Sequence, residues 1–416
     1  MHCTSGRPET AALNVQVSLY RDEMSYAQSI KIEDLETDPY PIYARLRREE
    51  PVAFVPAANV WFATRWADVE TVTKNPDVFS AEAPTSPVEI SFGKPTILTS
   101  DGPVHKELRS AVEPQYRPRP VIGYIDGLVR PIAEAYLAAF EGQGAAELMA
   151  NYFEAVSALS LARSFGLNQV DVPVLRRWFH GLSQGAINYE RDPARQAICD
   201  QACAEIDAAL LPILQRLAKE PNNSPLSHML HAGLQEGQSR PPEFVLPSVK
   251  VTLLGGMQEP GHGAGSILVG LLRNPEQFGR LKADMNEWLP RAVDEGLRWV
   301  APIGTQMRIT TRDVEIGGVV VPAGEPIAAV LSSANHDEAE FENPHLFDMA
   351  RPKRASATFG FGSHFCAGKW FSKAQIEIAL GVLLSRFPNL QLDQSRLPEF
   401  RGWEFRAPTS LHVLLN

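Results

Sequence analysis

The feature that most constrains this chain is the segment FGFGSHFCAG (residues 359–368), which places a cysteine behind a glycine-rich turn. Glycines lack a β-carbon, so this backbone can turn sharply and lie against a flat ligand. After Cys366, apolar residues recur with helical spacing as far as Pro388. The start of a helix favours the thiolate, which is the form of cysteine that binds metals. The alternative is a buried structural cysteine on a turn.

The complete pattern FGxGxHxCxG resembles the cysteine loop of the cytochrome P-450 superfamily. The resemblance implies that Cys366 is the proximal ligand of the iron of haem b, and that His364 lies near a haem propionate. The resemblance to the superfamily extends from Asp38 to the C-terminus. It therefore implies a mainly α fold with small β-sheets, the cytochrome P-450 fold, in a single domain over residues 1–416 with an N-terminal extension at residues 1–30.

Composition excludes several classes of protein. A net charge of −10 argues against a nucleic-acid surface, and 44% hydrophobic with 21% charged residues are globular values. Neither a secretory signal nor a run of about 20 apolar residues opens the chain, so we expect no membrane anchor and a cytoplasmic protein. The pair Cys199 and Cys203 lies in an alanine-rich helical run, and we interpret both as ordinary thiols rather than zinc ligands.

Two cations share one face of a predicted helix near residue 101. Pro103 suits the first helical turn and puts His105 and Arg109 four residues apart. From spacing alone they form a solvated charged face. The resemblance implies instead that they hold the haem propionates together with Arg308, which lies on a predicted strand.

The remaining elements follow from periodicity and turn residues. We expect a β-hairpin of two short strands, further strands at residues 305–311 and 314–321, and a long irregular loop at 79–99 that contacts substrate. The region from 119 to 235 is predicted to be mostly helical, and a pair of helices within 170–220 is expected to form a lid over the substrate. The predicted hairpin strands and helices are residues 52–55, 60–63, 121–141, 148–165, 172–187 and 194–217.

A long apolar helix over residues 248–272 contains an interruption. Pro260 has no N–H and its ring clashes with the carbonyl of Gly256, so we expect a kink there. The superfamily usually has an acid followed by a threonine at this place, whereas this chain has Gln258 and Glu259. We expect these two side chains to be catalytic.

Two interpretations of Glu259 remain open. It is either a solvated or paired helix carboxylate, or a carboxylic acid in an apolar pocket that replaces the alcohol and passes protons through water. Burial would raise its pKa, which suits a proton donor near neutral pH. His262 either pairs with Glu259 or faces elsewhere.

Glu295 and Arg298 lie three residues apart, a spacing that lets a carboxylate meet a guanidinium on one helix. Such a pair is common on helix surfaces. At this distance before the cysteine loop it resembles the buried pair of the superfamily, with Arg351 as a third member, and the resemblance implies a structural role.

Within the superfamily, four strings are similar to bacterial enzymes that O-demethylate guaiacol-type methoxyphenols, a reaction of lignin degradation. We expect Phe92, Phe405 and Gly256 to contact such a substrate. Those relatives have phenylalanine where we align Ala186. Alanine removes most of that ring and leaves space for a second methoxy group, so we expect this chain to prefer syringol over guaiacol. The strings are MQEPGHG (257–263), EGLRW (295–299), SANHD (333–337) and APTSLHV (407–413).

The expected reaction uses O2 and releases formaldehyde and a catechol-type phenol from a small aromatic substrate. The chain has no flavin, nicotinamide or iron–sulfur motif, so electrons must come from a separate ferredoxin- or flavin-type reductase. Three alternatives stay open: a peroxygenase that uses hydrogen peroxide directly, a hydroxylase of another small aromatic or a terpene, and a haem sensor or carrier without turnover.

Overall fold

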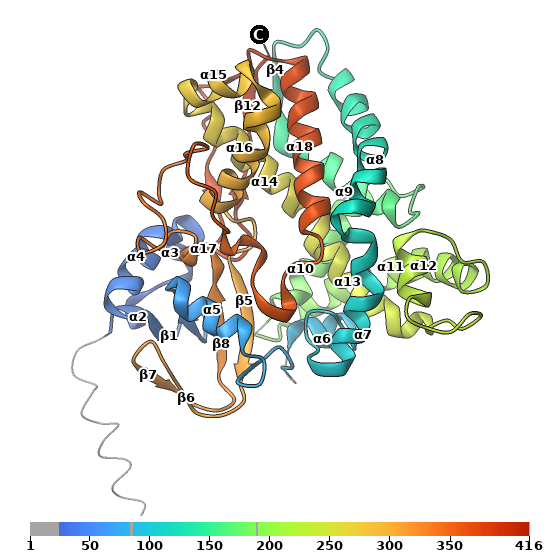
Figure 1. Ribbon diagram of the computed structural model, residues 1–416, viewed down its shortest axis with the longest axis vertical. Helices are drawn as coiled ribbons and strands as arrows, with labels where there is room; N and C mark the ends of the chain where they lie inside the picture. The colour runs from blue at the N-terminus through green and yellow to red at the C-terminus, as the bar shows by residue number, and fades with distance from the viewer. Residues whose placement is uncertain (1–24, 84–85, 189, 416) are drawn as a thin grey trace, which may run out of the picture.

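The computed structural model describes residues 25–83, 86–188 and 190–415. Helices predominate, and Figure 1 shows several of the longer ones packed around α18 (Lys369–Arg386), with the largest β-sheet at the lower left. Helix α8 (Pro118–Ala138) lies along α18, and α14 (Glu259–Leu272) packs against both α18 and α16 (Met285–Trp299). The predicted mainly α fold with small sheets is confirmed.

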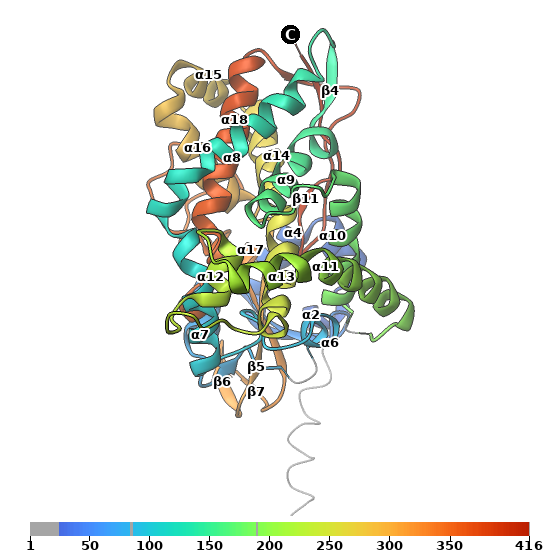
Figure 2. The ribbon, with the colours of Figure 1, turned by 90° about the vertical axis from the view of Figure 1, so that its right-hand side faces the viewer.

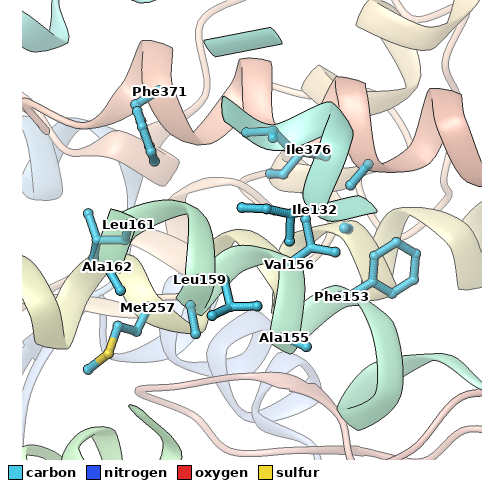
Figure 3. Packing of buried hydrophobic residues seen from close by; sticks show 14 of the residues in the cluster. Ile132, Phe153, Ala155, Val156, Leu159, Leu161, Ala162, Met257, Phe371 and Ile376 are labelled. Atoms are coloured by element: carbon cyan, nitrogen blue, oxygen red, sulfur yellow. The ribbon is translucent and has the colours of Figure 1, made fainter. Parts of the chain in front are cut away.

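The main core lies where these helices meet α9 (Glu154–Ser164). Figure 3 shows apolar side chains from several elements converging there, including Leu161, Met257 and Phe371. Burying one such side chain contributes about 1.5–3 kcal/mol, so this cluster stabilises the whole helical part.

The largest sheet has the strand order β1-β2-β8-β5-β3. Strands β1 and β2 form the predicted hairpin, in which Val52 pairs with Ala63. Strand β5 pairs antiparallel with β8 and carries Arg308 opposite Ile327. The strands of this sheet are β1 (Val52–Val55), β2 (Val60–Ala63), β3 (Phe79–Ser80), β5 (Thr305–Thr310) and β8 (Pro326–Val330).

The long apolar helix is broken as predicted. Helix α13 (Pro242–Met257) ends at Gln258, and α14 starts at Glu259. Figure 2 shows α13 crossing the middle of the molecule with α10 (Val172–Ala186) and α11 (Pro193–Lys219) beside it. The predicted break between the last two helices is present, and the lid role of this pair stays a prediction.

Three predicted elements differ from the structure. The segment 79–99 is not one irregular loop, because residues 87–92 form helix α6 (Pro87–Phe92) after strand β3. Residues 314–321 form a hairpin, β6 (Val314–Ile316) and β7 (Val319–Val321), since two glycines with positive φ turn the chain between them. The predicted helix at 148–165 starts with a π-helical turn, η2 (Met149–Phe153).

The first 24 residues, with Cys3, lie outside the described residues, as does most of the predicted N-terminal extension. The end of that extension is ordered, because Tyr26–Ser29 forms the short helix α2. Among the helices of the described ranges, none combines the length and the apolar character needed to cross a membrane.

Candidate active site

The cysteine loop runs from a 3-10 turn, η3 (Ala357–Phe359), to the start of α18. Gly360 and Gly362 both have a φ of +68°, a conformation that other residues rarely adopt. A Cβ on Gly360 would lie 2.7 Å from the side-chain oxygen of Gln306, and one on Gly362 would lie 2.5 Å from the Thr73 carbonyl oxygen. Both positions therefore require glycine.

The thiol of Cys366 is open to an internal cavity. The Cys366 amide donates to the Phe359 carbonyl oxygen at 2.9 Å, which closes the turn behind the sulfur. Burial raises the pKa of the Cys366 thiol, while the amides of Gly368 and Lys369 and the charge of Arg109 lower it. A metal cation overcomes such a burial penalty, because a coordinating thiol loses its proton.

Four basic side chains gather beside this cavity: His105, Arg109, Arg308 and His364. The rings of His105 and His364 stack with centroids 4.0 Å apart, and Arg109 and His364 line the cavity. Burial, with the charges of His364 and Arg109, lowers the pKa of His105 to about 4. Burial also lowers the pKa of Arg308 to about 10. The structure thus brings together the four predicted propionate ligands.

Asp101 belongs to this cluster, and the sequence did not predict it. Its Oδ1 accepts from His364 Nε2 at 2.9 Å, and its Oδ2 accepts from the Ser80 hydroxyl and the Ala81 amide. An aspartate before a helix normally caps it, but Asp101 makes no side-chain cap bond to α7 (Gly102–Val112). These bonds offset burial and hold the pKa of Asp101 well below its usual range.

The residues present fit a haem. Three buried nitrogens of the cluster have no hydrogen-bond partner within the described part of the chain: His105 Nε2, His364 Nδ1 and Arg308 Nη2. The carboxylates of Asp101 and Glu113 bond to His364 and Arg109, and a ligand with two further carboxylates supplies acceptors for the remaining nitrogens. The same cavity presents the Cys366 thiol and two glycines of α13, Gly255 and Gly256, as a macrocycle above a thiolate requires.

Glu259 lies on the wall of the same cavity, at the break between α13 and α14. Its side chain is buried, Oε2 accepts only from the Gln258 amide at 3.3 Å, and Oε1 has no partner among the described residues. Burial raises the pKa of Glu259 to about 7, and the charge of His262 opposes that rise. Of the two interpretations above, the structure supports the buried acid. Gln258 is half-buried and contributes its backbone here rather than a cavity-lining side chain.

The substrate contacts predicted from sequence are placed differently. Gly256 lines the cavity, but Phe92, Ala186 and Phe405 are not among the lining residues. Helix α6 turns Phe92 into the core, where it is buried with Ala186. Phe405 lies behind the wall, because it forms an isolated β-bridge with Ile303, which does line the cavity. This arrangement does not support the three predicted ring contacts.

The wall that replaces them is apolar, and it comes in part from two segments that the sequence singled out, the predicted substrate loop at 79–99 and the long apolar helix over 248–272. The segment after α6 supplies two residues, α9 and α13 one each, and the segment before β5 another. Apart from being hydrophobic, these aliphatic residues show no sequence pattern that would mark them as lining a cavity. They are Ile97, Leu98, Leu161, Val251 and Ile303.

The three residues predicted to interact, Glu295, Arg298 and Arg351, form one network of ion pairs. Arg298 donates two parallel hydrogen bonds to Glu295, at 2.8 and 2.7 Å, and both side chains are at most 5% exposed. Arg351 Nε lies 3.3 Å from Glu295 Oε2. Arg298 also donates to the carbonyl oxygens of Asn335, Pro344 and Leu346. The network ties α16 to the chain segments that precede the cysteine loop.

Asn335 continues this network to the loop itself. Its amide donates to the Thr358 hydroxyl at 3.0 Å, and its oxygen accepts from the Ala357 amide at 2.7 Å. The Thr358 hydroxyl in turn donates to the Leu297 carbonyl oxygen on α16. Both residues that enter the cysteine loop are therefore fixed by side chains outside it.

Comparison with known proteins gives consistent matches. The family model described as cytochrome P-450 matches residues 271–414. The chain is 29% identical to the cytochrome P-450 monooxygenase PikC of Streptomyces venezuelae, over 87% of each chain. It is 26% identical to the putative cytochrome P-450 YjiB of Bacillus subtilis, over 85% of this chain and 88% of the other.

Solved structures agree with the fold. CYP109Q5 from Chondromyces apiculatus aligns with a TM-score of 0.81 at 25% identity, covering 92% of this chain and 96% of that one. CYP109B1 from Bacillus subtilis aligns with a TM-score of 0.79 at 25% identity, covering 91% of this chain and all of that one.

Replacing Glu295 with glutamine tests the buried network. Glu295→Gln leaves the buried guanidinium of Arg298 and the partly buried one of Arg351 without their carboxylate, so we expect the free energy of unfolding to fall by about 3–5 kcal/mol, measured by urea denaturation. Glu276→Gln is the matched control, because its helical pair with Arg280 is exposed, and should cost less than about 1 kcal/mol. Equal losses in the two variants would refute a structural role for the network.

The buried acid at Glu259 makes a second prediction. Its pKa rises from an ordinary 4.5 to about 7 on folding, so the folded state binds this proton more tightly and loses stability as pH rises between those values. Relative to wild type, Glu259→Gln should gain about 3 kcal/mol over that range, as denaturation at a series of pH values would measure. A pH-independent difference would mean that Glu259 titrates normally.

Proposed function

Because the chain belongs to the cytochrome P-450 superfamily of haem-thiolate monooxygenases, we propose that it O-demethylates a small methoxyphenol of the guaiacol or syringol type. The observation that carries the proposal is the segment MQEPGHG (257–263), which places the buried carboxyl of Glu259 on the cavity wall at a helix break. This segment resembles that of bacterial O-demethylases and replaces the usual acid and threonine of the superfamily.

The cavity has the character that such a substrate needs. Its wall beyond the cysteine loop has many aliphatic side chains, with Thr252, Thr305, Gln306 and Tyr116 among its neutral polar groups. The Thr252 hydroxyl is already engaged with the Ser248 carbonyl oxygen at 2.8 Å. A small aromatic ring is favoured by such a wall, and a charged ligand is not. Since Ala186 is not on this wall, the proposal covers the class and no preference within it.

The haem would be held by Cys366 below the macrocycle and by His105, Arg109, Arg308 and His364 at its propionates. A haem with a thiolate ligand supplies the oxidation of unactivated C–H bonds with O2. Methoxy-carbon hydroxylation gives a hemiacetal, which collapses to a phenol and formaldehyde; the reaction consumes O2, two electrons and two protons and releases water. A separate ferredoxin- or flavin-type protein would supply the electrons.

Glu259 is the residue we assign to proton delivery. Its unpartnered Oε1 and its pKa of about 7 allow it to hold a proton near neutrality and release it into the cavity. Pro260 follows it directly, so the threonine that superfamily members use has no equivalent there. The helix pair α10–α11 would serve as the lid that excludes water during this step.

Formaldehyde release tests the substrate class. With reduced ferredoxin, ferredoxin reductase and O2, wild type should release formaldehyde from syringol or guaiacol in proportion to the electrons supplied. Cys366→Ser is the control, because it removes the thiolate. A wild type that consumes electrons without releasing formaldehyde from any methoxyphenol would refute the proposal.

The role of Glu259 predicts a pH dependence. The protonated acid is the donor, so formaldehyde released per electron pair should fall as pH rises through about 7. In Glu259→Gln this yield should be roughly 100-fold lower and nearly independent of pH. The same profile in variant and wild type would exclude Glu259 as the donor.

The same carboxyl favours a second candidate function. A buried acid beside the cavity can take a proton from hydrogen peroxide and return it to the leaving water, which is what a peroxide-driven peroxygenase requires. Robust formaldehyde release with peroxide, and none with reduced ferredoxin and O2, would select this function. The opposite result would exclude it.

A further inference from the structure

Three local irregularities meet beside Glu259. The long helix breaks at Gln258, and the π-helical turn η2 ends one residue before Glu154. Gly261 lies between them: a Cβ on this glycine would be 2.8 Å from the Phe153 carbonyl oxygen and 3.0 Å from the Glu154 Cα. The absence of a side chain at Gly261 lets α14 approach the backbone of α9 closely. π-Helical turns occur frequently at functional sites.

This close approach decides where His262 points, a question that the sequence left open. Its Nε2 lies 3.7 Å from Glu154 Oε1 on α9. Its Nδ1 is buried without a partner among the residues that the structure describes. On α14, His262 is three residues after Glu259 and so on a neighbouring part of the helix surface. An imidazole that lies near one carboxylate and one helical turn from a second carboxyl can accept a proton at one nitrogen while it gives one up at the other.

Glu154 links His262 to the surface. Its Oε2 lies 3.6 Å from Arg176 on α10, which also donates to the Ala150 carbonyl oxygen. Burial would raise the pKa of Glu154, but His262 and Arg176 together bring it below its usual value. Glu154 is therefore an anion that can attract a proton from solvent toward His262.

Exposure rises along this series of side chains. Glu259 is 5% exposed, while the side chains of His262, Glu154 and Arg176 are 13%, 19% and 36% exposed. The series therefore runs from the cavity wall, through α14 and α9, to solvent at α10. Among the described residues, His262 is the ionisable neighbour that acts on Glu259.

We propose that His262 and Glu154 form the route by which solvent protons reach Glu259. The proposal rests on the proposed function, in which Glu259 is the proton donor to the cavity. When Glu259 releases its proton, His262 protonates it again, and Glu154 guides a proton from solvent onto His262. Each step moves one proton, and after the full cycle one proton has passed from solvent to the cavity and the three side chains are back in their starting protonation states. His262 and Glu154 act through Glu259 and are positioning residues.

Hydrogen–deuterium exchange of the Glu259 carboxyl tests the route without substrate. The haem-loaded ferric protein is mixed with D2O below neutral pH, where Glu259 keeps its proton, and the carbonyl stretch of the acid is followed by stopped-flow infrared spectroscopy. The band that is missing in Glu259→Gln identifies the residue. His262→Gln and Glu154→Gln should each slow the exchange at least about tenfold.

Glu205→Gln is the matched control. Its carboxylate bonds Arg177, the neighbour of Arg176 on α10, but belongs to the outer surface and not to the route. Exchange in this variant should equal that of wild type. A substitution that merely loosened the fold would admit water and speed the exchange, so slower exchange separates a relay from a structural effect.

Two results would overturn the proposal: exchange in His262→Gln and Glu154→Gln at the wild-type rate, or the lack of any carboxyl band that Glu259→Gln removes. The assay distinguishes this failure from failure of the proposed function. Exchange needs neither substrate nor electrons, so a wild type that releases no formaldehyde still gives a decisive exchange rate.

Discussion

The buried carboxylate of Glu295 is the interaction on which the active site depends. It meets Arg298 through two short hydrogen bonds and also contacts Arg351, while Arg298 binds three carbonyl oxygens of the chain between α17 (Leu331–Ala334) and the cysteine loop. Asn335 then fixes the entry to that loop through Ala357 and Thr358. A buried ion pair is seldom favourable by itself, since both charges lose their hydration. Here it holds an irregular segment that has little regular structure of its own.

The cavity combines two opposite electrostatic arrangements. Around Asp101, two histidines and two arginines converge, and three of their nitrogens lack partners within the described ranges, so this side of the cavity favours a ligand that supplies acceptors, such as a carboxylate. At the helix break, burial keeps Glu259 in its neutral form up to about pH 7. The first arrangement costs stability until the propionates of a haem bind. The second arrangement lowers the free energy of unfolding at high pH, where Glu259 ionises, but it keeps a proton beside the cavity below that pH.

The sequence predicted those features that depend on local chemistry. The glycine turn before Cys366, the break at Gln258 and the pair Glu295–Arg298 each follow from the residue types and their spacing. Contacts between distant segments could not be read in this way. Asp101 has the pattern of a helix cap, and only the tertiary fold brings His364 to it. Phe92, Ala186 and Phe405 were expected at the substrate from the resemblance to O-demethylases, and their hydrophobic character gave no sign of which side of a layer each one faces.

The most direct test of the account is a visible-absorption titration of the purified ferric protein with syringol, guaiacol and a carboxylated methoxybenzene in parallel. We predict a low- to high-spin shift with a methoxyphenol, because the aliphatic wall around Ile303 and Val251 favours a neutral ring beside the iron. We predict no shift with the carboxylated analogue, because Arg109 and His364 would already bind the haem propionates and the aliphatic wall offers its charge no other partner. A shift with the carboxylated compound alone, or with none of the three, would contradict the assignment of this cavity to methoxyphenols.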